Sequence, residues 1–471
     1  MQTPQMPNDQ LKQQRHALMA GPPILPVEKP CRLGDGILLL SEEEQERLRT
    51  IARTSFVDVQ FFIPASGSGS RMFSFLEEFL EQPSAEGAQQ AERFFSKLPA
   101  FSFFSKLPSS LQNAYFEGTL ALHDLIRFLL DPDRLNFGQI PKGLIPFHVH
   151  EPITLNAFQE HLAQGANLTM GTTKYHFTIQ QEFEYAFIQA QNELSALTNQ
   201  TYDLDFSTQD KNTDAFVFDA QFEVFIDADG SPLRRPAGHG TLLQNLAALK
   251  APYILVKNID NVQHFSQKQQ SVDNWRYLLG LQMEIRSQLS TFLAARDFEG
   301  LIQWNAQIGL FDSENLRELN VDAWTELLNR PLRVCGMVRN NGQPGGGPFW
   351  LQLNGQNTKQ IVEKTQLVGH PQMSQLMLQS AYFNPVLMVL SPCDLNNQPH
   401  DLTQFADPES YFVVEKTQQG KKVQFVEQPG LWNGAMAKWN TLFVEVPSEV
   451  FSPVKTVLDL LEFAHLANKG A

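Results

Sequence analysis

Short apolar runs alternate with longer helix-like stretches along most of this 471-residue chain. Apolar runs that end in polar or turn-forming residues predict strands. The predicted strands are VDVQFFI (57–63), YHFTI (175–179), AFVFDAQFEVFID (215–227), PYILVKNID (252–260), LRVCGMV (332–338) and NTLFVEVP (440–447). Helical stretches separate several of them, notably TLNAFQEHLAQGA (154–166) and WRYLLGLQMEIRSQLSTFLAAR (275–296). The alternation predicts an α/β fold with helices on both faces of a sheet.

The spacing of turn residues predicts one core domain. Residues 1–50 are an N-terminal extension with proline and glycine in GPPILPVEKP, followed by a helix that Ser41 can cap. Residues 51–471 form the α/β core. Two stretches within it, at about 73–138 and 266–330, have a helical pattern, and no Gly/Ser-rich linker separates the strands on either side of the second one. We therefore expect a single core with two helical insertions.

Charge and cysteine content exclude several classes of protein. The chain has 36 basic and 51 acidic residues, for a net charge of −15, which disfavours duplex nucleic acid as its main partner. Three widely spaced cysteines support neither a disulfide framework nor a structural zinc site. The N-terminus lacks the apolar stretch of a signal peptide, and nowhere do about 18 uninterrupted apolar residues predict a membrane span. We expect a soluble, cytoplasmic protein, and the sequence leaves its oligomeric state open.

A glycine- and serine-rich loop, FIPASGSGSRMF (62–73), lies where the first predicted strand meets a helix. Such turns often bind phosphate, although they can be purely structural. A P-loop requires a lysine after its last glycine, whereas Ser70 and Arg71 follow Gly69 here. A dinucleotide-binding loop requires a third glycine, and the chain continues with Arg71 and Met72 instead. The first interpretation fails and the second is disfavoured.

Residues 66–72 resemble the signature Gly-Gly-x-Gly-Thr-Arg-Met of sugar nucleotidyltransferases, which a Pro-Lys pair follows. In that family small residues let backbone amides approach a nucleoside triphosphate, and the arginine meets its phosphates. The Pro-Lys pair ends here in Lys142. Three features depart from the signature: Ser66 replaces a glycine, Ser70 replaces a threonine, and about 70 residues separate Arg71 from Lys142.

Further segments in the same chain order are similar to segments of uridine-diphosphate-sugar pyrophosphorylases. They are IPKGLIPF (140–147), RPAGHGTLLQNL (235–246), KNIDNV (257–262), MAKWNTLFVEVP (436–447) and FSPVKTVLDLL (451–461). A closer resemblance is to a bacterial family known only as a domain of unknown function, which shares PASG..SRMF, KGLIPFH, GHG.LL.NL, N.DN, GGGPFW, PGLWNGAM..WNT.FVEVP and PVKTV.DLL. Because that family has no established activity, the enzyme hypothesis rests on the likeness to the pyrophosphorylases.

The resemblance implies a nucleotide-diphospho-sugar transferase fold of the GT-A, Rossmann-like type. This is a mixed, mostly parallel sheet with the nucleotide at the carboxyl ends of its strands. It also implies a magnesium-dependent nucleotidyltransferase that moves a uridylyl group from UTP, or another nucleoside triphosphate, to a sugar 1-phosphate and releases pyrophosphate. Uridine is preferred because the GHG, DN and PVKT segments resemble those of uridine-specific enzymes.

The same resemblance assigns roles to individual residues. It implies catalytic phosphate contacts from Arg71, Lys142 and Lys455, and magnesium binding by Asp260. The implied nucleotide-binding residues are Ala65, Ser66, Gly67, Ser68, Gly69, Ser70, Gly238, His239 and Gly240, and the implied substrate-binding residues are Asn261, Glu363, Asn433 and Asn440. Structural alternatives stay open: Asp260 can end a strand in a turn, Lys455 can be a solvated lysine, and Asn440 can cap a turn or be a second metal ligand.

A rival hypothesis keeps the fold and removes the catalysis. Ser66 in the place of a glycine and the distant Lys142 are also compatible with a nucleotide-sugar-binding protein that no longer turns over.

Other catalytic motifs receive little support. His148 and His150 in PFHVHEP would share one face of a strand, but two histidines without a third ligand nearby are usually not a metal site. The chain has no Gly-x-Ser-x-Gly or His-Glu-x-x-His motif, so hydrolase chemistry has no positive signal.

Overall fold

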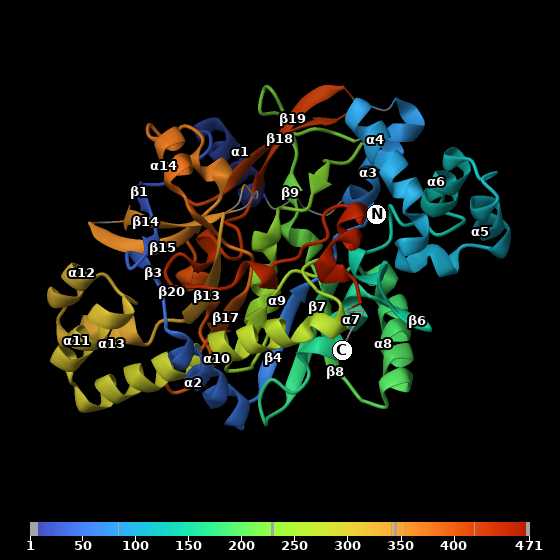
Figure 1. Ribbon diagram of the computed structural model, residues 1–471. Coiled ribbons are helices and arrows are strands. Elements are labelled where there is room, and N and C mark those ends of the chain that lie inside the picture. Colours follow the sequence, from blue (N-terminus) through green and yellow to red (C-terminus); the bar gives the residue numbers. More distant parts are fainter. Residues whose placement is uncertain are drawn as a thin grey trace, which may run out of the picture. The chain divides into compact units, whose positions relative to one another are not determined.

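The computed structural model describes residues 8–82, 84–227, 230–340, 342, 346–353, 355–418 and 420–467 (Figure 1). Within it the chain divides into two compact units. The first unit comprises Met1–Leu48, Gln209–Leu255 and Leu278–Val446, and the second comprises Arg49–Thr208, Val256–Tyr277 and Pro447–Ala471. The first residue of the GGGPFW motif, at position 345, lies outside the described residues.

Three parallel strands form the sheet of the second unit. They pair in the order β4 (Val59–Pro64), β7 (Thr173–Ile179) and β8 (Asp203–Thr208). Strand β4 is buried from Val59 to Ile63, as expected for a parallel strand that is covered on both faces. An antiparallel hairpin follows the helical segment, with strands β5 (Pro146–His150) and β6 (Ile153–Asn156).

The α-helices from α3 to α8 lie between these strands in the order of the chain. They are α3 (Ser70–Glu81), α4 (Ala85–Ser96), α5 (Ser109–Phe116), α6 (Leu122–Leu130), α7 (Ala157–Gly165) and α8 (Glu184–Thr198). Phenylalanine rings pack the segment from α3 to α6: the Phe94 ring lies 4.9 Å from that of Phe101 and 6.2 Å from that of Phe75, measured between centroids. The many phenylalanines of this stretch therefore form a core of their own.

The main sheet of the first unit is also mostly parallel. Its parallel strands are β2 (Arg32–Leu33), β3 (Gly36–Leu38), β20 (Asn440–Glu445) and β13 (Leu332–Arg339), and the antiparallel ones beside β13 are β17 (Met388–Ser391) and β16 (Tyr382–Phe383). The prediction of an α/β protein with a mixed, mostly parallel sheet is therefore confirmed.

Smaller antiparallel pairings complete the first unit. They are β1 (Val27–Pro30) with β14 (Gly347–Leu353) and β15 (Gln356–Val362), β10 (Phe218–Asp219) with β19 (Lys421–Glu427) and β18 (Phe412–Gln418), and β9 (Ala215–Phe216) with β11 (Arg234–Arg235). Its helices are α1 (Asn8–Ala20), α9 (Leu243–Ala247), α11 (Phe298–Ile308), α12 (Ser313–Arg317), α13 (Val321–Leu328) and α14 (Met373–Gln379). The division between the units falls inside α2 (Glu42–Thr54), β12 (Ile254–Val256) and α10 (Lys268–Ala295).

Several element predictions are confirmed and three need correction. Of the strand expected over 252–260, only β12 forms, and the chain leaves the strand after Val256. Ser41 caps α2 as expected, since its hydroxyl accepts from the Glu44 amide at 3.3 Å. The expected strand over 215–227 breaks into β9 and β10, because Phe222 has a φ of 61° in a turn and the Asp219 carboxylate accepts from amides that follow it. The expected helix over 154–166 begins at Ala157, because Asn156 forms a capping box with Gln159.

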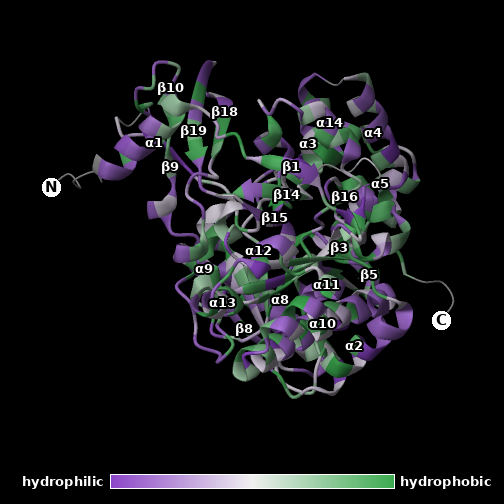
Figure 2. Cartoon of the chain, turned by 90° about the vertical axis from the view of Figure 1, so that its left-hand side faces the viewer, coloured by the Kyte–Doolittle hydropathy of each residue, from purple (hydrophilic) through white to green (hydrophobic). Residues whose placement is uncertain are grey.

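Burial follows the apolar pattern. Figure 2 shows both hydrophilic and hydrophobic residues along α10, and the apolar ones include the buried Leu278 and Ile285. The three cysteines, Cys31, Cys335 and Cys393, are buried and free. Among the described residues, no helix combines the length and apolar character needed to span a bilayer.

Candidate functional site

The Gly/Ser loop connects β4 to α3 in the second unit, as the sequence predicts. Gly69 is the N-cap of α3, and a Cβ atom there would lie 2.3 Å from the Phe137 carbonyl oxygen, so only glycine fits. A Cβ on Gly67 would meet no described atom within 4 Å, so this side of the loop is open. Ser66 is not among the described residues with positive φ, and a serine therefore sits there without backbone strain.

The distant Pro-Lys segment lies directly against this loop. The Lys142 amide donates to the Gly67 carbonyl at 2.9 Å, and the Gly69 amide donates to the Ile140 carbonyl at 2.9 Å. Between these two bonds, Ser68 forms an isolated bridge with Pro141. The helices α3 to α6 thus leave the loop and return the chain to it, and the separation of about 70 residues in sequence disappears in space.

Several polar groups of the loop have no hydrogen-bond partner among the described residues. No hydrogen bond joins the backbone amides of Gly67, Ser68 or Ser70 to another described residue, and α3 has neither a side-chain cap nor an acidic residue in its first turn. Arg71 is exposed, and its guanidinium makes no hydrogen bond or ion pair within the described ranges. Free amides at a helix N-terminus beside an unpaired guanidinium make an arrangement suited to an anion.

A buried carboxylate with two lysines lies beside the loop. Asp260 is 8% exposed, and its Oδ2 accepts from Lys142 Nζ at 3.2 Å and from Lys455 Nζ at 2.9 Å. Lys142 also donates to the Val454 carbonyl at 3.0 Å. The other carboxylate oxygen, Asp260 Oδ1, is buried without a partner among the described residues. One carboxylate oxygen is therefore available to a further ligand.

The charges of this cluster perturb one another. Burial by itself would raise the pKa of Asp260, but the ammonium groups of Lys455 and Lys142 outweigh it and hold that pKa below its usual value. Burial is the main cause that lowers the pKa of Lys142; Asp260 opposes it, while Lys455 and Arg71 add to it. Two lysines thus share one carboxylate, and Arg71 adds a third positive charge near Lys142, so positive charge is in excess.

The C-terminal segment that carries Lys455 is paired with the residues around Asp260. The Val454 amide donates to the Asp260 carbonyl at 2.9 Å, and Asn261 Oδ1 accepts from the Ser452 amide at 2.9 Å. Asn261 is 1% exposed, and its Nδ2 has no partner in the described part of the chain. The Asn261 side chain therefore holds the segment around Ser452 through its Oδ1, while its Nδ2 group stays available.

The glycine–histidine–glycine segment and two of the predicted substrate residues meet in the first unit. The His239 ring stacks on Trp432 with a centroid distance of 4.1 Å, and its Nδ1 accepts from the Leu431 amide at 2.9 Å. Glu363 accepts hydrogen bonds from the side chains of Trp432 and Asn433. Burial lowers the pKa of His239 to about 4, so the ring is neutral at pH 7.

Burial also acts on Glu363. It raises the pKa of this carboxyl, and the hydrogen bonds from Trp432 and Asn433 only partly oppose it. Both positions beside His239 require glycine: Gly238 has a φ of 73°, and a Cβ on Gly240 would lie 2.1 Å from the Pro429 carbonyl oxygen. This aromatic and neutral set is distinct in chemistry from the lysine cluster.

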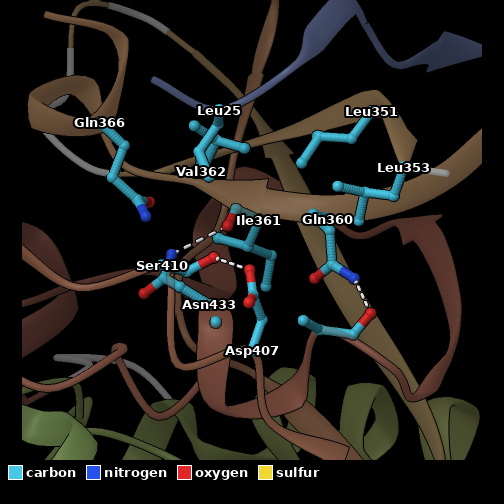
Figure 3. Close-up of a pocket in the computed structure, with 12 residues that line it drawn as sticks. Leu25, Leu351, Leu353, Gln360, Ile361, Val362, Gln366, Asp407, Ser410 and Asn433 are labelled. Carbon is cyan, nitrogen blue, oxygen red and sulfur yellow. Dashed lines mark hydrogen bonds between the residues drawn. The ribbon is translucent and has the colours of Figure 1, made fainter. Parts of the chain in front are cut away.

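A small pocket of the first unit includes one of these residues. Figure 3 shows Asn433 with its Nδ2 directed to the Ile361 carbonyl, which it donates to at 2.9 Å, while its Oδ1 has no partner among the described residues. The apolar wall comes from Leu25, Leu351 and Leu353. Arg71, Lys142 and Lys455 do not line this pocket.

Asn440 has a structural contact within the first unit. It opens β20, is 5% exposed, and its Nδ2 donates to the Leu327 carbonyl at 2.8 Å, so its amide holds β20 to the end of α13.

Two polar residues of the second unit were not singled out by the sequence. Lys257 directly follows β12, is 4% exposed, and burial lowers its pKa to about 7. Gln180 donates from Nε2 to the Ser66 carbonyl at 2.6 Å and thereby holds the loop. A lysine directly after a buried ILV run was a usable signal for the first, whereas nothing in the local sequence pointed to the second.

The chain is similar to several solved structures, and it matches one family. No curated protein matches the chain. A protein described as a UDP-N-acetylglucosamine pyrophosphorylase from Entamoeba histolytica has a TM-score of 0.46 at 12% identity, over 90% of this chain and 82% of that one. A UDP-glucose pyrophosphorylase variant from Leishmania major has a TM-score of 0.42 at 13% identity, over 93% and 70%. A UDP-glucose phosphorylase from Trypanosoma brucei has a TM-score of 0.43 at 14% identity, over 95% and 73%. No site residue is assigned from these likenesses.

The family match covers nearly the whole chain. Residues 1–466 match the family described as "Domain of unknown function (DUF4301)", as the shared motifs of the sequence predict. The protein therefore belongs to the DUF4301 family.

Proposed function

We propose that this protein is a nucleotidyltransferase that transfers a uridylyl group from UTP to a sugar 1-phosphate and releases pyrophosphate. The observation that carries the proposal is the cluster in the second unit. Lys142 and Lys455 share one oxygen of Asp260, beside a loop that presents unpaired amides and Arg71. A site with three cations, free amides and one carboxylate suits a nucleoside triphosphate better than a neutral ligand.

The reaction needs no nucleophile from the protein. An oxygen of the sugar 1-phosphate forms a bond to the α-phosphorus of UTP, and the bond from that phosphorus to the oxygen of the β-phosphate breaks. Pyrophosphate leaves with the electron pair, and the product is a UDP-sugar. Two polyanions must approach each other, so the protein contributes positioning and positive charge.

The chain's own residues divide this work. Arg71 and the amides of Gly67 and Ser68 bind the β- and γ-phosphates, which become the leaving group. Lys142, mostly buried and held by Asp260, contacts the phosphates near the reacting centre. Lys455 has a side chain that is 58% exposed, and it can leave Asp260 to bind the incoming sugar phosphate. Ser66 and Ser70 complete the wall of the loop.

One atom of this site, Asp260 Oδ1, is a suitable ligand for magnesium. Asp260 Oδ1 is a buried carboxylate oxygen without a partner among the described residues, and Mg²⁺ prefers one or two carboxylates together with phosphate oxygens. When bound, the ion supplies charge neutralisation to the phosphates. Asp260 would hold it, while the lysines on Oδ2 keep the carboxylate oriented and ionised.

The first-unit group supplies a different kind of contact. His239 and Trp432 offer stacked aromatic faces, and Glu363 and Asn433 offer side chains whose hydrogen bonds among the described residues include no cation. Groups of this kind suit a base or a sugar, because such ligands carry ring faces and hydroxyl or amide edges. The proposal for the phosphates rests on the second unit alone. The finer assignment to a GT-A fold and to uridine is part of the same proposal and rests on the sequence motifs.

The test is pyrophosphate release from UTP with magnesium, across a panel of sugar 1-phosphates. We expect turnover with at least one sugar, and its loss in Arg71→Ala and Asp260→Ala. The matched controls are Arg127→Ala and Asp124→Ala, two exposed positions on α6 that should keep wild-type rates. UTP binding without turnover on any sugar would favour the catalytically inactive binder, and absence of UTP binding would contradict both hypotheses.

A further inference from the structure

A second group of ligand-type side chains lies in the second unit, and the proposed reaction does not use it. His148 and His150 are on β5, and Glu160 is in the first half of α7. Glu160 Oε1 lies 2.7 Å from His148 Nδ1 and 2.6 Å from His150 Nε2. These three atoms all lie within 4.8 Å of one another. The third ligand that the sequence lacked beside the two histidines is therefore supplied by the helix.

The atoms on the outer side of this group have partners of their own. His148 Nε2 lies 2.9 Å from His465 Nδ1, and Glu160 Oε2 accepts from Gln164 Nε2 at 2.8 Å. The ring of His150 stacks on His264 with a centroid distance of 4.2 Å. Metal-binding histidines and carboxylates usually have such outer partners, which orient the ligand atoms toward the ion.

Burial makes a bound cation favourable at this place. Glu160 is 0% exposed, and a buried carboxylate is costly unless positive charge or strong hydrogen bonds accompany it. The side chain of His150 is 19% exposed, so an ion can enter along its edge. The group is thus enclosed on the side of Glu160 and accessible on the side of His150.

We propose that His148 Nδ1, His150 Nε2 and Glu160 Oε1 form a binding site for a divalent transition metal ion of the zinc type. Two imidazole nitrogens and one carboxylate oxygen are a ligand set that zinc uses when one position stays open to water. Magnesium prefers oxygen ligands alone, so this site is chemically separate from Asp260.

Binding requires only a small rearrangement. Ligands at about 2.0–2.1 Å from a tetrahedral zinc ion are about 3.3 Å apart, so the two hydrogen bonds to Glu160 must open by about 0.7 Å. Both bonds use one oxygen of Glu160. To bind the ion, each neutral histidine would carry its proton on the other ring nitrogen, which for His148 is Nε2, 2.9 Å from His465 Nδ1. The ion would join β5 to α7 and, through His465, to the C-terminal segment.

The experiment is a zinc titration of the full-length chain after treatment with a chelator, in competition with a chromophoric zinc indicator. We expect one tightly bound ion per chain. In His150→Ala and Glu160→Gln the affinity should fall by about 100-fold or more, since even outer partners of a metal site contribute about 10- to 100-fold. His123→Ala is the matched control, because His123 is exposed on α6 and far from this group in sequence.

Folding and coordination are checked in the same proteins. Circular dichroism decides whether the buried substitution Glu160→Gln is folded, and if it is not, the partly exposed His150→Ala decides alone. Cobalt(II) in place of zinc should give a visible ligand-field spectrum in the wild type and His123→Ala but not in His150→Ala. A folded wild type that binds zinc no more tightly than His150→Ala would overturn the proposal and leave a hydrogen-bonded network without metal.

Discussion

Two carboxyl groups, Asp260 in the second unit and Glu363 in the first, respond in opposite ways to burial. The pKa of Asp260 is lowered because two lysines outweigh the effect of burial. The pKa of Glu363 is raised because its partners Trp432 and Asn433 are neutral and burial prevails. The neighbours of Asp260 therefore favour the ionised carboxylate, whereas the surroundings of Glu363 shift the balance toward the protonated form.

This difference separates two kinds of recognition. Cations around an ionised carboxylate suit a polyphosphate and its magnesium ion, whereas aromatic rings and uncharged hydrogen bonds suit a base or a sugar. If the comparison holds, changes at the ionic group should affect turnover, and changes at the neutral group should affect the affinity for one substrate.

The largest effect is expected from Asp260→Asn. Removing the carboxylate charge should lower turnover by about 10³-fold, by analogy with the loss of a preorganised group at a transition state. UTP binding should persist, because Lys142 and Lys455 lose their counter-charge and become available. Pyrophosphate release and calorimetric UTP binding measure the two quantities. Loss of UTP binding together with turnover would show that Asp260 maintains the fold instead.

A smaller effect is expected from Arg71→Ala. Turnover should fall by about 10²-fold, through the loss of one charge-assisted phosphate contact. The melting temperature should not change, because the side chain of Arg71 is exposed and makes no hydrogen bond or ion pair with the described residues. Arg127→Ala on α6 is the control for both quantities. Wild-type turnover in Arg71→Ala would contradict the proposal that Arg71 contacts the phosphates of the substrate.

At Glu363 of the first unit we expect Glu363→Gln to weaken the affinity of the protein for a sugar phosphate by about 10-fold, which corresponds to about 1.4 kcal/mol. The substitution should also stabilise the protein at pH 7. A raised pKa in the folded state means that wild-type stability is lost as the pH rises through that value, and glutamine lacks this loss.

The advantage of Glu363→Gln should therefore shrink as the pH falls toward the ordinary pKa of a glutamate, about 4.5. Urea unfolding at several pH values measures it. An advantage that grew at low pH would mean that Glu363 is stabilised as a carboxylate, and the contrast with Asp260 would disappear.

The smallest effect is expected from Ser66→Gly, which restores the glycine of the transferase signature. Because Ser66 is not among the described residues with positive φ, we expect kcat to change by less than about 3-fold. Steady-state kinetics on the same sugar measure this. A gain of 10-fold or more would show that the serine obstructs the approach of the triphosphate.

The sequence by itself determined the local features of the site. Gly69 at the start of α3, the buried strand β4 and the cap at Ser41 follow from backbone sterics, hydrophobic pattern and capping, which act over a few residues. The sequence also carried the motifs that identify the family. The prediction was less good where a side chain replaces a strand partner as hydrogen-bond acceptor. The carboxylate of Asp219 accepts from the Gln221 amide, and the chain turns where a strand was expected.

Only the tertiary structure decided which residues meet. Asp260 is 118 residues from Lys142 and 195 from Lys455. Glu160 is hydrogen-bonded to His148, which is in turn hydrogen-bonded to His465. No periodicity links positions so far apart, because their proximity depends on how strands pair and where the chain returns to a loop. The charge state of each carboxyl follows from the same cause, since burial and neighbouring charges exist only once the chain has folded.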